Sequence, residues 1–246
     1  MGFWDHLEEL RSTLVKCAFA FAIFAGLIGY FLKEFNQVIL WPLHDVAARY
    51  PDEDFRLTSI SPVEAFNIVI QVCLLGGLVM AAPFILFFIG QFVAPALTPR
   101  EKRAVLPMCF AALVLFLCGA SFAFFVLVPG TLNVSVEINR IFDFDFNWTP
   151  GSYYSILMWL TLGVGAAFEF PLLIILLVHL GIVSTAFLRR YRRHAIVIIF
   201  IGAAVVTPTA DPFLQTFFAA PLYLLYEIAI FAGRRIEKRR EAELLS

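Results

Sequence analysis

Four long apolar runs dominate the pattern of hydrophobic and polar positions along this chain. They extend from about Leu14 to Leu32, Ala65 to Val93, Ala104 to Val128 and Tyr153 to Leu180. A helix needs roughly 20 apolar residues, at about 1.5 Å each, to cross the hydrocarbon core of a bilayer. Each run is about that long or longer, so the pattern predicts four membrane-spanning helices.

Two further apolar runs in the C-terminal part of the chain are shorter or interrupted. The first, from Arg193 to Thr207, holds about 13 uninterrupted apolar residues, or roughly 20 Å of helix. The second, from Phe213 to Ala232, contains Pro221 and Glu227. We interpret them as short fifth and sixth spans, which makes the chain an all-α polytopic membrane protein with six transmembrane helices. A re-entrant hairpin in this region is the alternative.

Composition favours a membrane protein and argues against a soluble enzyme. Of the 246 residues, 61% are hydrophobic and only 15% are charged, whereas soluble domains carry about a quarter charged residues. The sequence has no HExxH, GxSxG or phosphate-binding glycine motif, and its four cysteines lie in apolar runs without metal-ligand spacing. We therefore expect one membrane domain over residues 1–246, no enzymatic activity, no metal and no cofactor.

The basic residues predict how the chain is oriented. In a six-span arrangement 14 of the 18 Lys and Arg residues fall on one side, and the positive-inside rule makes that side the cytoplasm, with both termini. The cytoplasmic parts would be an amphipathic lead helix (1–13), a first loop (95–103), a second loop (182–193) and a basic tail (233–246). The outer loops would be 33–64 and 132–152.

The first residues of the chain have the spacing of an amphipathic helix. Phe3, Leu7 and Leu10 recur on one face, whereas Glu8 and Glu9 fall away from it. A helix that binds a membrane surface normally has a basic polar face, and this one is mostly acidic. It is either a solvated cap on the first span or a set of carboxylates that await a cationic partner.

Three further glutamates stand out by their surroundings. Glu101 lies among three bases in the first cytoplasmic loop, where charge balance is the simplest interpretation. Glu169 lies deep in the fourth apolar run, where an ionised, lipid-facing carboxylate costs several kcal/mol. It should therefore face a cavity or stay protonated, in a functional role or in a local structural hydrogen bond. Glu227 is expected to extend to the membrane surface from the end of its helix.

The second, fourth and sixth apolar runs are each interrupted by a proline, at Pro83, Pro171 and Pro221. Each removes a backbone hydrogen bond and is predicted to bend its helix. Curved helices would form the wall of a concavity, although prolines are also simply common in membrane helices.

Short motifs spread over nearly the whole chain together resemble the TatC family, the core membrane subunit of the twin-arginine protein translocase. The matching segments are Asp5-His6-Leu7-Glu8-Glu9-Leu10-Arg11, Ser61-Pro62-Val63-Glu64-Ala65-Phe66, Ala82-Pro83-Phe84-Ile85-Leu86, Phe92-Val93-Ala94-Pro95-Ala96-Leu97, Glu101-Lys102-Arg103, Phe168-Glu169-Phe170-Pro171, Thr207-Pro208, Asp211 and Tyr226-Glu227-Ile228. Each piece alone is weak, but the combination is specific. The resemblance implies six helices, short fifth and sixth spans and a concave, glove-like body.

The resemblance also implies which residues bind. In this family a glutamate in the lead helix and one in the first cytoplasmic loop bind the twin-arginine signal peptide, which here implies Glu9 and Glu101, with Arg11 and Arg103 close by in the same motifs. Two guanidinium groups suit carboxylates that accept bidentate hydrogen bonds, and lysine substitutes poorly.

Further positions match residues of known family motifs. Glu169 matches an intramembrane glutamate that faces the concavity, and Thr207 and Gln215 match polar positions where single-span subunits of the TatA and TatB type dock. Asp211, Pro83 and Phe92 are also family-motif positions. Two positions depart from relatives: Phe88 stands where glutamine is frequent, and Phe124 where some have tyrosine.

The function implied is that of a core receptor subunit in the cytoplasmic (inner) membrane. It would bind Arg-Arg signal peptides, as part of an oligomeric complex with its partner subunits, and organise export of folded proteins driven by the proton-motive force. The alternative is a proton-coupled carrier of small solutes, with Glu169 as the coupling carboxyl. The lack of an internal repeat and the acidic lead helix argue against a carrier.

Overall fold

A computed structural model describes residues 3–51, 53, 55–96, 102, 105–144, 148–207 and 211–244. The part of the chain that it describes is helical and contains no strand. Helix α1 (Phe3–Tyr30) is followed by the short helices α2 (Leu32–Ile39) and α3 (Trp41–Arg49) and then by the long α4 (Pro62–Val93), which ends in a 3-10 turn at Ala94–Ala96. The expected first outer loop therefore contains two helices.

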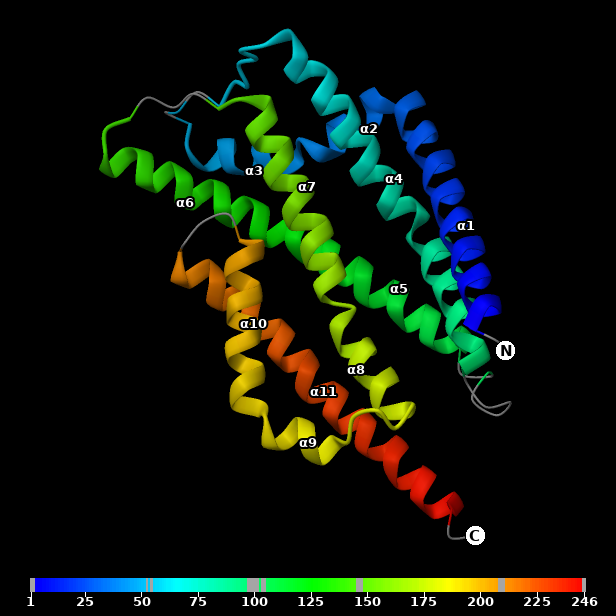
Figure 1. The fold of residues 1–246 in the computed structure, drawn as a ribbon. Coiled ribbons are helices and arrows are strands. Elements are labelled where there is room, and N and C mark those ends of the chain that lie inside the picture. Colours follow the sequence, from blue (N-terminus) through cyan, green and yellow to red (C-terminus); the bar gives the residue numbers. More distant parts are fainter. Residues whose placement is uncertain are drawn as a thin grey trace.

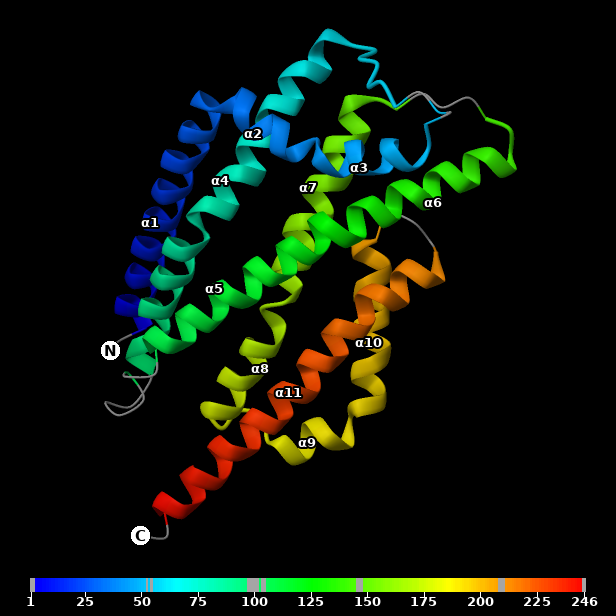
Figure 2. The same ribbon diagram turned by 180° about the vertical axis from the view of Figure 1, so that it is seen from behind.

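The remaining helices complete the bundle in Figure 1. They are α5 (Val105–Phe122), a π-helical turn (Ala123–Leu127), α6 (Val128–Ile141), α7 (Pro150–Ala167), α8 (Phe170–His179), α9 (Thr185–Arg190), α10 (Arg192–Val206) and α11 (Pro212–Leu244). Helices α1 and α4 run side by side at one edge of the molecule, α10 and α11 form the other, and α5–α6 crosses between them (Figures 1 and 2). The start of α1 and the end of α11 lie toward the same end of the bundle.

Five helical stretches among the described residues are long and apolar enough to cross a membrane. They are His6–Tyr30, Pro62–Val93, Val105–Ile141, Pro150–His179 and Pro212–Glu237. The four long apolar runs are thus confirmed as helices. Helix α10 has 15 residues, which is about 22 Å of helix and short for a span. A sixth crossing therefore stays a prediction.

Two helix boundaries differ from the sequence prediction. The lead segment is not separate from the first span, because α1 runs without a break from Phe3 to Tyr30. The third apolar run ends at Val128, but its helix continues as α6 to Ile141, well into the expected second outer loop. Val128, Leu132 and Val136 of α6 are fully buried, so packing against the rest of the protein extends a helix whose other face is polar.

The three prolines act differently from one another. Pro83 and Pro221 lie inside the continuous helices α4 and α11. Only Pro171 accompanies a break, because α7 ends at Ala167 and α8 begins at Phe170. A break in the helix therefore accompanies one of the three prolines, and the other two leave their helices continuous.

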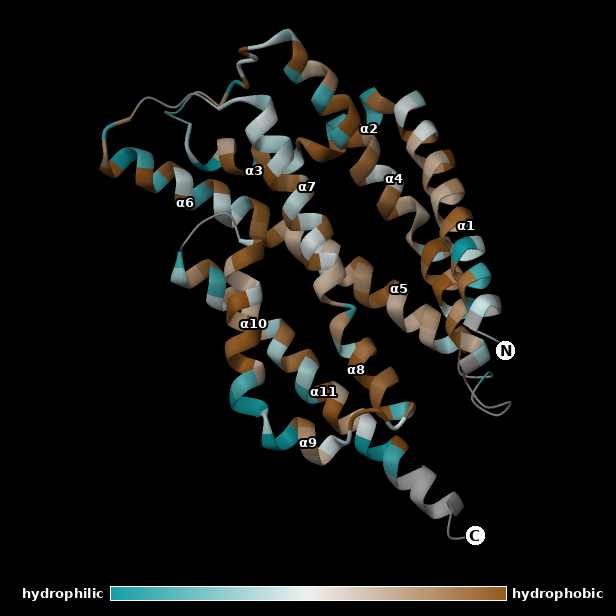
Figure 3. Ribbon diagram, in the orientation of Figure 1, coloured by the Kyte–Doolittle hydropathy of each residue, from teal (hydrophilic) through white to brown (hydrophobic). Residues whose placement is uncertain are grey.

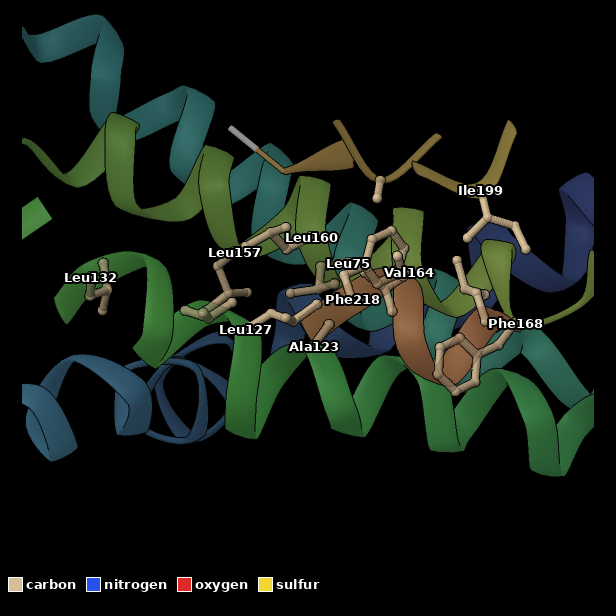
Figure 4. Close-up of a cluster of buried hydrophobic side chains, with 14 of the residues drawn as sticks. Leu75, Ala123, Leu127, Leu132, Leu157, Leu160, Val164, Phe168, Ile199 and Phe218 are labelled. Atoms are coloured by element: carbon tan, nitrogen blue, oxygen red, sulfur yellow. The ribbon is translucent and has the colours of Figure 1, made fainter. Parts of the chain in front are cut away.

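The core lies where α5–α6, α7 and α11 meet. Figure 4 shows Leu127, Leu157, Leu160 and Phe218 gathered there, and none of them is more than 1% exposed. At the edge, Gly77 of α4 lies so close to α1 that an added Cβ would be 2.9 Å from the Cα atom of Ala25. Figure 3 shows hydrophobic residues along α5, α8 and α10, whereas hydrophilic residues gather around α9 and the start of α10. This distribution fits helices surrounded by lipid, with polar ends.

Candidate functional site

The lead helix holds the Glu9 carboxylate close to His6, whose ring contacts the end of α4. Oε2 of Glu9 is buried and has no hydrogen-bond partner among the described residues, and it lies 4.0 Å from Nδ1 of His6. The His6 ring stacks on Phe92, with ring centroids 4.7 Å apart. Phe92 is in the last turn of α4, so this aromatic contact fixes the start of α1 beside the chain that enters the next loop. A buried, unpaired carboxylate oxygen there is ready to accept a hydrogen bond.

The other residues expected at this site are only partly placed. Arg11 is exposed on α1. Glu101 and Arg103 lie outside the described residues, so their predicted proximity to Glu9 stays a prediction. Position 102, which lies between them, is exposed.

An apolar groove begins near the same end of the molecule and contains Glu169. It has a volume of about 290 Å³ and lies between the C-terminal half of α4, the start of α5, and α8. Among the described residues Glu169 is the single charged one in its lining, and the others are Leu86, Ile89, Gly90, Val93, Val105, Met108, Cys109, Ala112, Leu172, Leu173 and Leu176. Glu169 thus lines a groove, and whether this groove holds lipid, water or a ligand in the membrane stays a prediction.

The helix break at residues 168–169 directs Glu169 into this groove. Phe168 is 7% exposed and packs on Phe122, and Gly119 leaves room for it, since a Cβ there would be 2.7 Å from the Phe168 ring. The backbone oxygen of Glu169 then accepts hydrogen bonds from Leu172 and Leu173 at the start of α8. Oε1 of its carboxyl group is buried without a partner among the described residues, whereas the carboxyl group also has a backbone hydrogen bond to Phe116, so a functional role and a local structural bond both remain open.

Thr207 and Gln215 make hydrogen bonds within the chain. The Thr207 hydroxyl is buried and donates to the backbone oxygen of Ala203 at 2.8 Å, at the end of α10. The Gln215 side-chain amide donates to the backbone oxygen of Phe200 at 2.8 Å and so joins α11 to α10. Gln215 also lines a groove of about 410 Å³ along α10. Of the two residues, Gln215 is the one at an open surface.

Asp211 and Pro83 have structural explanations. Both carboxylate oxygens of Asp211 accept backbone hydrogen bonds, from Phe213 at 3.4 Å and Leu214 at 2.9 Å, so Asp211 caps the start of α11. Asp followed by Pro212 at the first helical position is a helix-start signal that sequence alone provides. Pro83 packs within α4 with no break.

Sequence reasoning missed the part played by Glu64. Its carboxylate accepts hydrogen bonds from the backbone of Gly151 at 2.7 Å and of Ile60 at 3.1 Å, and from the hydroxyl of Ser59 at 3.1 Å. It therefore ties the start of α4 to the start of α7. Ser61 followed by a glutamate three residues later is a helix-start pattern, but that pattern does not reveal the contact to Gly151, 87 residues away.

Glu227 makes contacts that the sequence did not predict. It forms an ion pair with Arg192 of α10 at 2.6 Å and accepts a hydrogen bond from the hydroxyl of Tyr223 at 3.1 Å. Its position relative to the membrane surface stays a prediction, and the ion pair with Arg192 is an additional contact. The pairing was not predictable because it depends on how α10 folds back along α11.

These features define a class of protein before any comparison is made. A helical bundle with several helices long enough to span a membrane, and with a carboxyl group in an apolar groove, has the features of a membrane transport protein.

Comparisons with known proteins then identify the family. The family model described as "Sec-independent protein translocase protein (TatC)" matches residues 5–221. The chain belongs to this TatC family and is a component of the twin-arginine protein translocation system.

Individual relatives agree over almost the full chain. The TatC protein of Koribacter versatilis is 33% identical and that of Aquifex aeolicus is 32% identical; the alignments cover 99% and 98% of this chain and 90% and 98% of the relatives. A crystal structure of the "Twin Arginine Translocase Receptor- TatC" in DDM has a TM-score of 0.79 and 34% identity, and covers 93% of this chain and 99% of the other. The fold is thus that of TatC.

Proposed function

We propose that this chain is the receptor subunit that binds Arg-Arg signal peptides and organises export of folded proteins by the proton-motive force. Glu9 and Glu101 accept the two guanidinium groups, and Arg11 and Arg103 orient these carboxylates. The observation that carries the proposal is the buried, unpartnered Oε2 of Glu9, fixed beside the end of α4 by the His6–Phe92 stack. Charge-assisted bonds from guanidinium to carboxylate are strong and favour arginine over lysine.

The apolar groove supplies the second part of the proposal. A signal peptide bound at Glu9 by its arginines would place its apolar segment in the groove between α4, α5 and α8. Leucine, isoleucine, valine and methionine side chains there match such a segment. Glu169 then meets the peptide at the deepest polar point, where its free Oε1 accepts a hydrogen bond.

The partner subunits are proposed to dock on α10 and α11. Gln215 lines the groove along α10, where a single-span helix would pack against Ile196, Val197 and Phe200. Small and polar groups at such contacts favour association of helices in lipid. We also propose that both termini are cytoplasmic. The two ends of the chain lie toward the same end of the bundle, which supports this orientation.

The test is binding of a fluorescent signal peptide to the detergent-purified protein. Exchange of Arg-Arg for Lys-Lys in the peptide, and Glu9→Gln or Glu101→Gln in the protein, should each weaken binding about tenfold, or about 1.4 kcal/mol. Glu8→Gln is the matched control, because Glu8 is an exposed neighbour on the same helix. Equal binding by every combination would remove the receptor assignment.

One observation also favours the second candidate, a proton-coupled carrier. Glu169 is a carboxyl group with an unpartnered oxygen in an apolar groove, as a coupling site requires. Solute uptake by vesicles that contain this protein alone discriminates the two functions. A carrier works without partner subunits, whereas the core of a translocase does not.

A further inference from the structure

A second groove lies at the end of the bundle away from both chain termini, where α1 ends and α4 and α7 begin (Figure 1). Its volume is about 590 Å³. One part of its lining is apolar and the other carries hydrogen-bond donors. The lining residues are Tyr30, Leu32, Lys33, Asn36, Leu40, Leu57, Ile68, Val69, Val72, Pro150 and Tyr154. No Asp or Glu is among them.

The polar part of the groove consists of donors held in place by a buried tyrosine. The hydroxyl of Tyr154 donates to Oδ1 of Asn36, and Tyr154 is only 5% exposed. Because this bond uses the amide oxygen, the Asn36 NH2 group is left to donate. Lys33 precedes Asn36 by about one turn of α2 and also lines the groove. Tyr30 lies at the rim of the groove, and 82% of its surface is exposed.

Lys33 differs from the neighbouring cations at this end of the molecule. Arg49 pairs with Asp45 at 2.5 Å and Arg140 pairs with Glu53 at 2.9 Å. Lys33 has no acidic partner in the described part of the chain. The nearby Glu64 does not supply one, since its oxygens already bind Gly151, Ile60 and Ser59. The groove therefore has positive charge and donors that the protein leaves unmatched.

The apolar part of the groove joins this cation to the membrane-spanning region. Ile68, Val69 and Val72 lie on α4, inside the stretch Pro62–Val93 that is long and apolar enough to span. A ligand that fits both parts has an anionic oxygen group at one end and a hydrocarbon chain at the other. Lysine at a membrane boundary attracts anionic headgroups by about 1 kcal/mol, and the fixed amide adds a directed hydrogen bond.

We propose that this groove is a binding site for an anionic phospholipid. Lys33 and the Asn36 amide bind the phosphate, and one acyl chain lies along Ile68, Val69 and Val72. The bound lipid would fill the space between the end of α1 and the start of α7. This site is separate from Glu9 and Glu169, so it does not depend on the function proposed above.

The experiment measures phosphatidylglycerol bound to the purified protein by native mass spectrometry. Lys33→Gln should lower the affinity about fivefold. Asn36→Asp should lower it further, because it keeps the oxygen that accepts from Tyr154 but replaces the donor with a negative charge. Lys16→Gln, in the middle of α1 and outside the groove, is the matched control and should retain the lipid. An unchanged unfolding temperature shows that the variants are folded.

Three outcomes would overturn the proposal. The groove does not bind phosphatidylglycerol if Lys33→Gln and Asn36→Asp both retain as much of this lipid as the parent protein. Equal, variant-independent retention of phosphatidylcholine and phosphatidylglycerol would indicate a non-selective lipid shell. Binding of inorganic phosphate that depends on Lys33, without lipid retention, would make this a site for a free anion.

Discussion

At the scale of single residues, Asp143 has an unfavourable backbone conformation for a residue other than glycine. Its φ of 55° lies in the left-handed region, where it ends α6. The backbone N–H groups of Asp143 and Phe144 donate to the oxygens of Arg140 and Asn139, which is the helix-ending arrangement that usually has glycine at this position. The turn also stacks the rings of Phe142 and Phe144, 5.6 Å apart.

Replacing Asp143 by glycine should therefore stabilise the protein. Glycine removes the steric cost of the left-handed conformation but adds entropy to the unfolded chain, so we expect a net gain of about 0.5 kcal/mol. Asp143→Ala should lower stability instead, because alanine tolerates positive φ less well than aspartate. Thermal unfolding in detergent measures both variants, and the same sign of shift for the two would contradict this account.

Single residues also show how far sequence predicts the site. Glu169 was recognisable because a carboxyl group in an apolar run has few explanations, and the structure places it in the lining of a groove. The contacts of Glu64 and Glu227 were not predictable, because their partners are 87 and 35 residues away in the chain. Asp211 was visible as a motif, and its capping role could have been predicted as well, because Asp before Pro212 is a helix-start signal.

At the scale of helices, the close contact of α1 and α4 depends on a missing side chain. A Cβ at Gly77 would be 2.9 Å from the Cα atom of Ala25 and 3.0 Å from its backbone nitrogen, and neither atom moves without the helix. Gly26, one residue further along α1, has nothing within 4 Å of its Cβ position. The two glycines thus form a matched pair for testing helix packing.

Gly77→Ala should destabilise the protein by about 1–3 kcal/mol, because it forces the two helix backbones apart. Gly26→Ala should raise stability by about 0.5–1 kcal/mol, because alanine is the better helix former and meets no neighbour. The measurement is the midpoint of thermal unfolding of each variant in one detergent. A loss of equal size at both positions would show that α1 and α4 are not packed as closely as described.

Helix boundaries show what the apolar pattern predicts and what it misses. The long runs predict α1, α4, α5 and α7–α8 because lipid requires each stretch to satisfy its own backbone hydrogen bonds. The extension into α6 is absent from that pattern, since its buried face forms only by packing against other helices. The π-helical turn at Ala123–Leu127 likewise depends on tertiary contacts, such as Trp41 against Phe124 and Phe125.

At the scale of the whole molecule, α10 decides how many times the chain crosses the membrane. Its 15 residues are too few for an ordinary span, yet its Arg192 is paired with Glu227 of α11, so the two helices form one unit. If α10 crosses, the membrane is thin beside it or its ends are sheltered. If it does not cross, the start of α11 lies on the same side as α9.

Three exposed positions distinguish these arrangements by labelling with a membrane-impermeant thiol reagent. Ile60 precedes α4, Ile182 precedes α9 and Phe213 begins α11, and they are 75%, 67% and 74% exposed. In sealed inside-out vesicles Ile182→Cys should react, whereas Ile60→Cys and Phe213→Cys should react only after the membrane is opened. Reaction of Phe213→Cys together with Ile182→Cys would instead show that α10 does not cross the membrane. That result would also remove the proposed docking surface, because a single-span partner has no full-length helix to follow along α10.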